Sequence, residues 1–417
     1  MFEQLKKQIK NTFKNKELDS IFSNCFLNTI DTTLSIDNGD YFVITGDIPA
    51  MWLRDSAMQV MHYLYFVKNK EVKDLIKGVI NKQFRLIAID PYANAFMHDE
   101  NCKSEWEGKI QTDFLPKIVW ERKYELDSLC YPFFLCSKFY EFTKDLSVFN
   151  KDFIKAFDTM IETIDKERNH SKKSAYYFIR PPQEDVGRNT NPEEEKGLVW
   201  SGFRPSDDAC EYHYHIPDNM FLVSVLSKLS QIFDLLKDNQ RKNTCVTLVK
   251  ELSKLIDKYG IIEKLGFGKI YVSETNCLGE YNTNDDANIP SLLSLPFLEY
   301  PFLDKGIYEN TRRFVLSKNN RFYYEGNLLK GIGSPHTPAD RVWPLSLSMQ
   351  GLTSNDEKEI LDCLKQLIIS TNNEKLMHES VDVNDVSKYS RPWFAWANSQ
   401  FCLFVLKHKD LINKSYL

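Results

Sequence analysis

Isolated carboxylates stand among aromatic and small polar residues at separate places in this chain. Asp207 and Asp208 lie in Arg204-Pro-Ser-Asp-Asp-Ala-Cys-Glu211, and Glu379 lies in Met377-His-Glu-Ser380. Two carboxyl groups that reach one pocket from distant segments, one as acid and one as base, can hydrolyse a glycosidic bond. Only one of two adjacent aspartates can face a given ligand atom, so the segments predict one acid from the Asp207 and Asp208 pair and one base, Glu379.

Further segments combine tryptophan with arginine and acidic residues, a composition typical of sugar pockets. Trp52 precedes Arg54 and Asp55, so we expect the indole to stack on a sugar face while the charged pair binds vicinal hydroxyls. The complete set of side chains that we expect to hold the sugar is Trp52, Arg54, Asp55, His98, Asp208, Asp286, His336, Arg341, Trp343 and Trp396.

Each of these residues also has a purely structural interpretation. Ser206 followed by two aspartates is a common helix start, in which the serine caps the helix and the acids meet its dipole. Glu379 would be an ordinary solvated carboxylate if its loop were exposed. Arg54 with Asp55 could form a surface ion pair of little energetic value. The tryptophans could pack a core, so the positions of these side chains decide between the interpretations.

Composition excludes several classes of protein. The chain has 417 residues and a net charge of -5, with no cluster of basic residues that would bind nucleic acid. No run of about 18 apolar residues predicts a membrane span, and the first residues lack the apolar stretch of a signal peptide, so we expect a cytoplasmic protein. The nine cysteines have no Cys-x-x-Cys spacing, and the histidines have no zinc spacing. We therefore expect no metal and no cofactor.

Helical periodicity dominates the chain, and short polar turns alternate with long loops rich in Gly, Asn, Pro and aromatic residues. The unusual segments lie where a long loop gives way to a predicted helix, at about Trp52, Asp127, Asp207, Asp286, Asp340 and Trp393. Six pairs of an inner and an outer helix predict an all-α fold, the (α/α)₆ toroid, with a pocket at the long-loop end. We expect one domain over residues 1–417, with an accessory first helix at about residues 3–15.

The chain resembles glycoside hydrolase family 125, the exo-α-1,6-mannosidases. The resemblance runs from Asp47-Ile-Pro-Ala-Met-Trp-Leu-Arg-Asp-Ser56 through Trp120-Glu-Arg-Lys-Tyr-Glu-Leu-Asp-Ser128 to His336-Thr-Pro-Ala-Asp-Arg-Val-Trp-Pro344 and His378-Glu-Ser380. It implies metal-independent, inverting release of non-reducing terminal mannose from α-1,6-linked manno-oligosaccharides such as N-glycan fragments. It also places the family's general acid on the Asp207 and Asp208 pair and its general base on Glu379.

The resulting mechanism makes Asp207, in preference to Asp208, the general acid. We expect an apolar, partly desolvated site to keep it protonated while Glu379 deprotonates the attacking water. Two other functions fit parts of the sequence. A sugar isomerase or epimerase on the same fold would use paired histidines, for which His213 and His215 are candidates. A glycan-binding protein without activity would keep the tryptophans and would not need Glu379.

Overall fold

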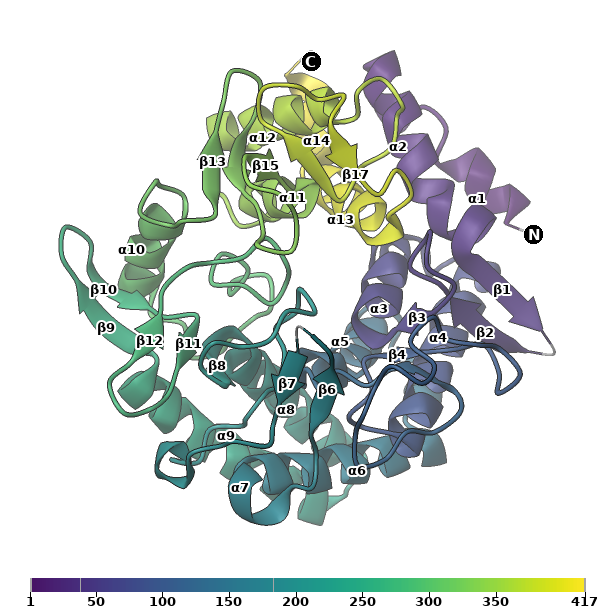
Figure 1. The fold of residues 1–417 in the computed structure, drawn as a ribbon. Coiled ribbons are helices and arrows are strands. Elements are labelled where there is room, and N and C mark those ends of the chain that lie inside the picture. The colour runs from purple at the N-terminus through teal and green to yellow at the C-terminus, as the bar shows by residue number, and fades with distance from the viewer. Residues whose placement is uncertain (1, 38, 183, 416–417) are drawn as a thin grey trace.

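Helices form a ring in the computed structural model, which describes residues 2–37, 39–182 and 184–415 (Figure 1). Within these residues, four inner helices are each followed along the chain by an outer helix. These pairs are α3 (Leu53–Met61) with α4 (Lys70–Ile89), α5 (Leu126–Thr143) with α6 (Lys151–Glu167), α8 (Ile216–Leu235) with α9 (Asn239–Tyr259), and α11 (Pro344–Leu352) with α12 (Glu357–Ser370). The predicted (α/α)₆ toroid is confirmed.

The fourth inner position is irregular. No α-helix follows Asp286 directly: residues 292–299 form turns, and α10 (Lys305–Val315) covers them from outside. The hydroxyl of Ser224 on α8 donates to the carbonyl of Leu298 at 2.5 Å, and that of Tyr308 on α10 donates to the carbonyl of Leu293 at 2.9 Å. Pro296 lacks the amide hydrogen that a regular helix would use here, which disfavours a helix in this segment, although α5 continues through Pro132.

The sixth pair joins the two ends of the chain. Helix α13 (Ala395–Lys407) packs against α3 and α11 on the inside, and its outer partner is the N-terminal α2 (Lys16–Asn28). Figure 1 shows the purple N-terminal helices beside the yellow C-terminal ones. The first helix predicted at residues 3–15 is shorter: α1 spans Glu3–Gln8, Asn11 adopts a left-handed φ of 58°, and the Asn15 side chain caps α2 instead.

The helix starts differ between the inner and outer rings. An asparagine or aspartate side chain caps every outer helix, at Asn15, Asn69, Asn150, Asp238, Asp304 and Asp356. The five inner helices have no side-chain cap, and the residues at their N-cap positions are Trp52, Glu125, His215, Trp343 and Phe394. The free amides and positive dipole ends of the inner helices therefore converge on one end of the ring.

Short antiparallel strands cover this end of the ring (Figure 1). Three sheets place strands directly before inner helices: β3, β4 and β5 before α3 and α5; β8, β11 and β12 before α8; and β15, β16 and β17 before α11 and α13. The strands are β1 (Leu34–Asp37), β2 (Asp40–Val43), β3 (Met51–Trp52), β4 (Ala95–Phe96), β5 (Val119–Glu121), β6 (Phe178–Arg180), β7 (Glu184–Val186), β8 (Tyr214–His215), β9 (Ile261–Lys264), β10 (Gly268–Tyr271), β11 (Glu274–Thr275), β12 (Tyr281–Asn282), β13 (Tyr323–Glu325), β14 (Lys330–Ile332), β15 (Arg341–Val342), β16 (Ser380–Asp382) and β17 (Tyr389–Ser390). Two short helices, α7 (His170–Lys173) and α14 (Lys409–Lys414), complete the α-helices of the described residues.

Burial separates the two rings of helices. Inner helix α13 buries all eleven residues from Ala395 to Val405, whereas outer helix α6 buries mainly the face of Phe153, Phe157, Met160 and Ile164. One cluster of buried hydrophobic side chains extends from Phe2 to Ile412, which is consistent with the proposed single domain. No helix in the described ranges is both long enough and apolar enough to cross a bilayer.

Candidate active site

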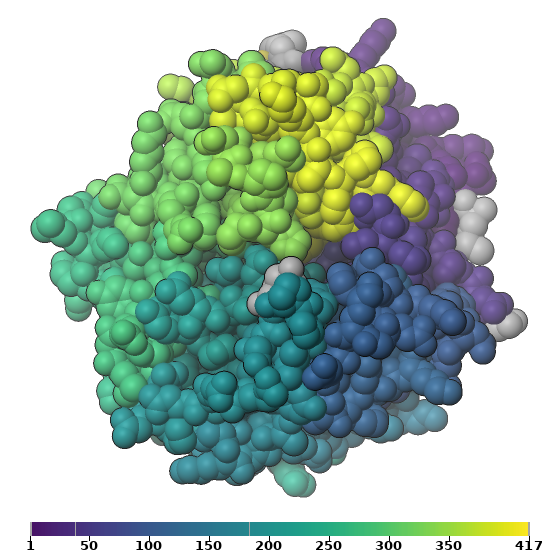
Figure 2. Space-filling model, viewed as in Figure 1, coloured from purple at the N-terminus to yellow at the C-terminus, as the bar shows by residue number. Residues whose placement is uncertain are grey.

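A pocket opens at the end of the ring where the inner helices begin. It is lined by Thr45, Ile48, Trp52, Arg54, Asp55, Pro205, Ser206, Asp207, Asn288, His336, Trp343, Glu379, Arg391, Phe394 and Trp396. Figure 2 shows this end of the molecule, where segments from the first, middle and last parts of the chain meet around the centre. Eight of the twelve side chains predicted from the sequence are among the lining residues, including both Asp207 and Glu379.

Asp207 lies in a tight turn and does not start a helix. The amide of Arg204 donates to the carbonyl of Asp208 at 2.8 Å, and the amide of Asp207 donates to the carbonyl of Arg204 at 2.9 Å. Asp207 adopts a left-handed φ of 65°, and α8 begins only at Ile216. This backbone conformation is uncommon outside glycine, although aspartate tolerates it better than most residues. The helix-cap interpretation of Ser206 to Asp208 is therefore wrong.

Arg54 connects the pocket to a buried group of acids. One guanidinium nitrogen, Nη2, donates to Oδ1 of Asp207 at 2.8 Å, and Nη1 donates to Oε2 of Glu125 at 2.7 Å and to Oδ2 of Asp127 at 3.1 Å. Arg54 is only 2% exposed, and its neighbour Asp55 accepts from the hydroxyl of Thr45 at 2.6 Å. Arg54 and Asp55 are therefore not a surface ion pair: they belong to the floor of the pocket.

The charge state of Asp207 differs from the expectation. Burial by itself would raise the pKa of its carboxyl, but the Arg54 guanidinium, a hydrogen bond with Glu125 and the Lys123 ammonium lower it below its usual range. The sequence analysis predicted an apolar site around Asp207, and this prediction does not describe the charged surroundings of its carboxyl. Two basic side chains stabilise its carboxylate, so any proton that makes it an acid must be held there by another group.

Glu379 lies in the strand-rich loop before α13. Its side chain is buried, and the Ser390 hydroxyl donates to its Oε2 at 2.8 Å. The Arg391 guanidinium lies 3.5 Å from Oε1 and also donates from Nε to Asp47 at 2.9 Å. These contacts fix the carboxylate at the wall of the pocket, so the interpretation of Glu379 as a solvated loop residue is wrong.

His336 lines the pocket beside Asp208, and nearby carboxylates change its pKa. The side chain is 40% exposed, and partial desolvation disfavours its charged ring, but the hydrogen bond and charge of Asp208, together with the charges of Asp207 and Glu379, raise the pKa of His336 to about 9. The ring nitrogen Nδ1 lies 3.3 Å from Oδ1 of Asp208, whose other oxygen accepts from Ser206 at 2.8 Å. Asp208 is therefore held by His336 and Ser206 and is not itself a lining residue.

The predicted tryptophans both pack in the core and line the pocket. Trp343 is 2% exposed and Trp396 is 1% exposed, as in a core, yet both line the pocket. The Trp343 indole donates to Thr337 at 2.9 Å, and the Arg54 guanidinium carbon lies 5.7 Å from the centre of a Trp396 ring. Trp52 completes the aromatic part of the wall.

Three other predicted residues lie outside the lining. His98 follows β4, where it lies 3.4 Å from Asp99 and packs against Phe42, and it does not line the pocket. Asp286 supports a lining residue, because its carboxylate accepts hydrogen bonds from the side chains of Asn288, which lines the pocket, and Ser334. Arg341 lies in β15 and pairs through its backbone with Asp382.

Arg391, Glu125 and Asn288 were not predicted, although each lies in or beside a segment singled out in the sequence. Arg391 stands two residues before Trp393, and Glu125 stands two residues before Asp127. The available signal was an arginine or acid next to a tryptophan or a second acid. Which of two neighbouring polar residues faces inward depends on turns that sequence periodicity does not specify.

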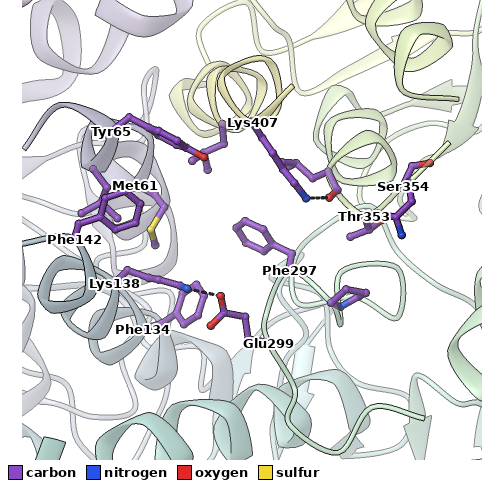
Figure 3. A pocket seen from close by; sticks show the side chains of 15 residues that line it. Met61, Tyr65, Phe134, Lys138, Phe142, Phe297, Glu299, Thr353, Ser354 and Lys407 are labelled. Carbon is purple, nitrogen blue, oxygen red and sulfur yellow. Dashed lines mark hydrogen bonds and ion pairs between the residues drawn. The ribbon is translucent and has the colours of Figure 1, made fainter. Parts of the chain in front are cut away.

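A second cavity lies at the opposite, C-terminal ends of the inner helices (Figure 3), and its volume of about 360 Å³ exceeds the volume of about 80 Å³ of the pocket that contains Asp207 and Glu379. Its walls are mainly apolar, with Phe134, Phe142 and Phe297. Lys138 pairs with Glu299, the one carboxylate among its lining residues, and Lys407 donates to the carbonyl of Leu352 at 2.6 Å. A single, already paired carboxylate cannot supply both an acid and a base, so chemistry favours the smaller pocket.

The histidines proposed for an isomerase lie outside the pocket. His213 donates from Nδ1 to the Ser201 carbonyl at 3.0 Å and stacks on Trp200. His215 is buried beside Asp218 at 2.9 Å, and burial lowers its pKa to about 4. Among the described residues, no group of three or more histidines, cysteines and acids is arranged to hold a metal ion.

The toroid and its pocket, with two carboxylates from distant segments, define a glycosidase. The profile of the metal-independent α-mannosidases, glycoside hydrolase family 125, matches residues 15–406, and the chain belongs to this family. The resemblance inferred from the sequence motifs is confirmed, and the α-mannosidase class follows from it.

Known proteins resemble the chain along its whole length. The meiotically up-regulated gene 157 protein of Schizosaccharomyces pombe is 37% identical, over 99% of this chain and 86% of that protein. A metal-independent α-mannosidase of Streptococcus pneumoniae, solved as a non-productive complex with α-1,6-mannobiose, is 38% identical over 98% of this chain and 97% of its own, with a TM-score of 0.92. A bacterial glucoamylase bound to acarbose covers 99% of this chain and 60% of its own at 13% identity and a TM-score of 0.65, which shows the shared fold alone.

Proposed function

We propose that this α-mannosidase is exo-acting and inverting, and that it releases the non-reducing terminal mannose from α-1,6-linked manno-oligosaccharides, including fragments of N-glycans. The observation that carries the proposal is that Asp207 and Glu379 line the same small pocket from segments more than 170 residues apart. The α-1,6-mannobiose complex of the Streptococcus pneumoniae relative supports the choice of linkage.

In the proposed reaction, Asp207 donates a proton to the glycosidic oxygen while the bond from this oxygen to C1 breaks. Glu379, held by Ser390 and Arg391, takes a proton from the water that attacks the opposite face of C1. Inverting enzymes place their two carboxyl groups roughly 6.5 to 9.5 Å apart so that this water fits between the base and the sugar. The product is then β-mannose.

Sugar recognition is assigned to the remaining lining residues. Trp52, Trp343 and Trp396 offer flat apolar faces to the sugar ring, and Asp55, His336 and Arg391 offer hydrogen-bonding groups to its hydroxyls. The ion pair of Arg391 with Asp47 joins the last long loop to the loop before β3 at the pocket wall. A narrow pocket closed in this way favours a chain end over the interior of a glycan.

The test compares mannobioses with α-1,2, α-1,3, α-1,4 and α-1,6 linkages, with free mannose as the readout. We expect rapid release from the α-1,6 disaccharide only, and we expect a longer α-1,6 oligosaccharide to lose one mannose at a time. Internal fragments would contradict exo-action, and equal rates on all linkages would contradict the proposed specificity. Binding without any release would instead favour a glycan-binding protein.

A further inference from the structure

Four carboxyl groups surround the single guanidinium of Arg54. Its nitrogens lie 2.7 Å from Glu125, 3.1 Å from Asp127, 2.8 Å from Asp207 and 3.8 Å from Asp55. Glu125 and Asp127 have fully buried carboxyl side chains, whereas the Asp207 side chain is 23% exposed to the pocket. Arg54 and the more distant Lys123 cannot balance four carboxylates, three of which are almost fully buried, so part of this cluster must keep its protons.

Glu125 is the acid that is best placed to keep one. Its Oε2 accepts from Arg54 and, at 2.9 Å, from the Ser128 hydroxyl, while no donor among the described residues reaches its buried Oε1. A hydrogen bond between the Glu125 and Asp207 carboxyl groups requires a proton on one of them. Burial raises the pKa of Glu125 well above its usual range, and the nearby charges of Asp207 and Asp127 raise it further. Glu125 and Asp207 bind the same Arg54 guanidinium, so the charge on one carboxyl changes the pKa of the other.

We propose that Glu125 is a positioning residue that stores the proton with which Asp207 acts as general acid. This inference rests on the proposed function and adds to it the origin of the acid's proton. When the sugar fills the pocket and removes water from Asp207, the Oε–H bond of Glu125 breaks and an Oδ–H bond forms on Asp207. Arg54 and Ser128 stabilise the Glu125 carboxylate that remains.

The proton balance closes over one turnover. Asp207 passes the proton to the glycosidic oxygen as the C1–O bond breaks, and Glu379 takes one proton from water. After the products leave, Glu379 releases its proton to solvent and the Glu125 and Asp207 pair takes up one proton from solvent. The exposed part of Asp207 gives this pair its route to solvent, because Glu125 has no surface of its own.

Leaving groups provide the sharpest test, because a good leaving group needs no proton. In Glu125→Gln, kcat/KM for α-1,6-mannobiose should fall at least about tenfold, whereas 2,4-dinitrophenyl α-mannoside should be cleaved at nearly the wild-type rate. Asp207→Asn should show the same selectivity, with a larger loss. Glu167→Gln is the control, because Glu167 is also a fully buried glutamate but binds Tyr92 and His170 instead of Arg54. Its ratio between the two substrates should remain that of the wild type.

The pH profile provides a readout that a structural role would not change. The alkaline limb of kcat/KM for mannobiose reports loss of the acid's proton. In Glu125→Gln, Asp207 would stand without its acidic partner beside basic groups, so this limb should move to lower pH. The charged and titratable groups that face the pair are Arg54 and Asp55 on α3, Lys123 before α5, Asp127 on α5, and His336 before β15.

The outcomes separate this inference from the proposed function. Equal losses of Glu125→Gln on both substrates, or no loss on either, would overturn the stored-proton role. If the wild type cleaves neither mannoside, the proposed function itself is wrong. If Glu125→Gln does not fold, carbon NMR of the wild type labelled at glutamate side chains reads Glu125 directly, and an ionised Glu125 at neutral pH in the unliganded enzyme would overturn the inference.

Discussion

The Arg54 guanidinium donates to the carboxylate of Asp207 at 2.8 Å from beneath the pocket. A cation in this position stabilises the ionised form of a group that must be protonated to act as an acid. The carboxylate that forms when the proton leaves is, however, stabilised by the same contact. Arg54 therefore favours the charge that develops on Asp207 in the transition state, provided that a second acid keeps a proton available in the ground state.

Neutral amides distinguish between the two candidate acids. Asp207→Asn should lower kcat on α-1,6-mannobiose by at least about a hundredfold and should affect an activated aryl mannoside much less. Asp208→Asn should cause a smaller loss, because Asp208 acts through His336 and does not line the pocket. Kinetics on both substrates measure the difference. A larger loss for Asp208→Asn would move the acid to that residue.

Replacing the base should be costly with any leaving group. Glu379→Gln leaves the attacking water without a proton acceptor, so both mannobiose and the aryl mannoside should react at least about a hundredfold more slowly. The matched control is Glu374→Gln, since Glu374 lies in the same loop but contacts Tyr389 outside the pocket. The control should retain wild-type kinetics. Activity of Glu379→Gln on the aryl mannoside would argue that another group activates the water.

The charge of His336 predicts a pH-dependent contribution to stability. The folded protein raises the pKa of His336 to about 9, above its ordinary value of about 6.5. The contribution of the charged ring to the free energy of unfolding is therefore fully present below pH 6.5 and is lost as the pH rises through 9. Urea unfolding of wild type and His336→Gln should give free energies that differ most near pH 6 and converge above pH 9. A constant difference would show that the ring stays neutral throughout.

Chelation tests the absence of a metal from the mechanism. The proposed chemistry uses only carboxyl groups and water, so kcat/KM should be unchanged after prolonged dialysis against EDTA. The control is a parallel sample to which calcium or zinc is returned. Activity that disappears on dialysis and returns with a divalent ion would contradict direct acid and base catalysis by Asp207 and Glu379.

The sequence predicted the ring of helices because the outer helices, such as α6, have strong apolar periodicity, whereas inner helices such as α13 are buried on every face. It predicted the pocket because the motifs fall in the long loops before the inner helices. The exact helix starts were harder to predict from the sequence. Helix α8 begins only at Ile216 because residues 204–208 close a turn, and the segment after Asp286, which contains Pro290 and Pro296, forms turns and no regular helix. Local patterns do not encode turns that are fixed by contacts such as that of Asp207 with Arg54.

The candidate residues were predicted less uniformly than the fold. Trp52, Arg54 and Trp396 sit at or next to the start of an inner helix, so their placement followed from the helix itself. His98 and Arg341 belong to loop and strand segments and are not among the residues that line the pocket. The charge state of Asp207 depends on Arg54, Lys123 and Glu125 together, and only tertiary structure brings these three side chains to one carboxyl.

The stereochemistry of the first product tests the central claim most directly, because it reports whether water or Glu379 itself attacks C1. Proton NMR of the anomeric region during the first minutes, before mutarotation mixes the anomers, should show β-mannose appearing ahead of α-mannose from an α-mannoside. Early α-mannose would contradict the account and would make Glu379 the nucleophile of a retaining enzyme.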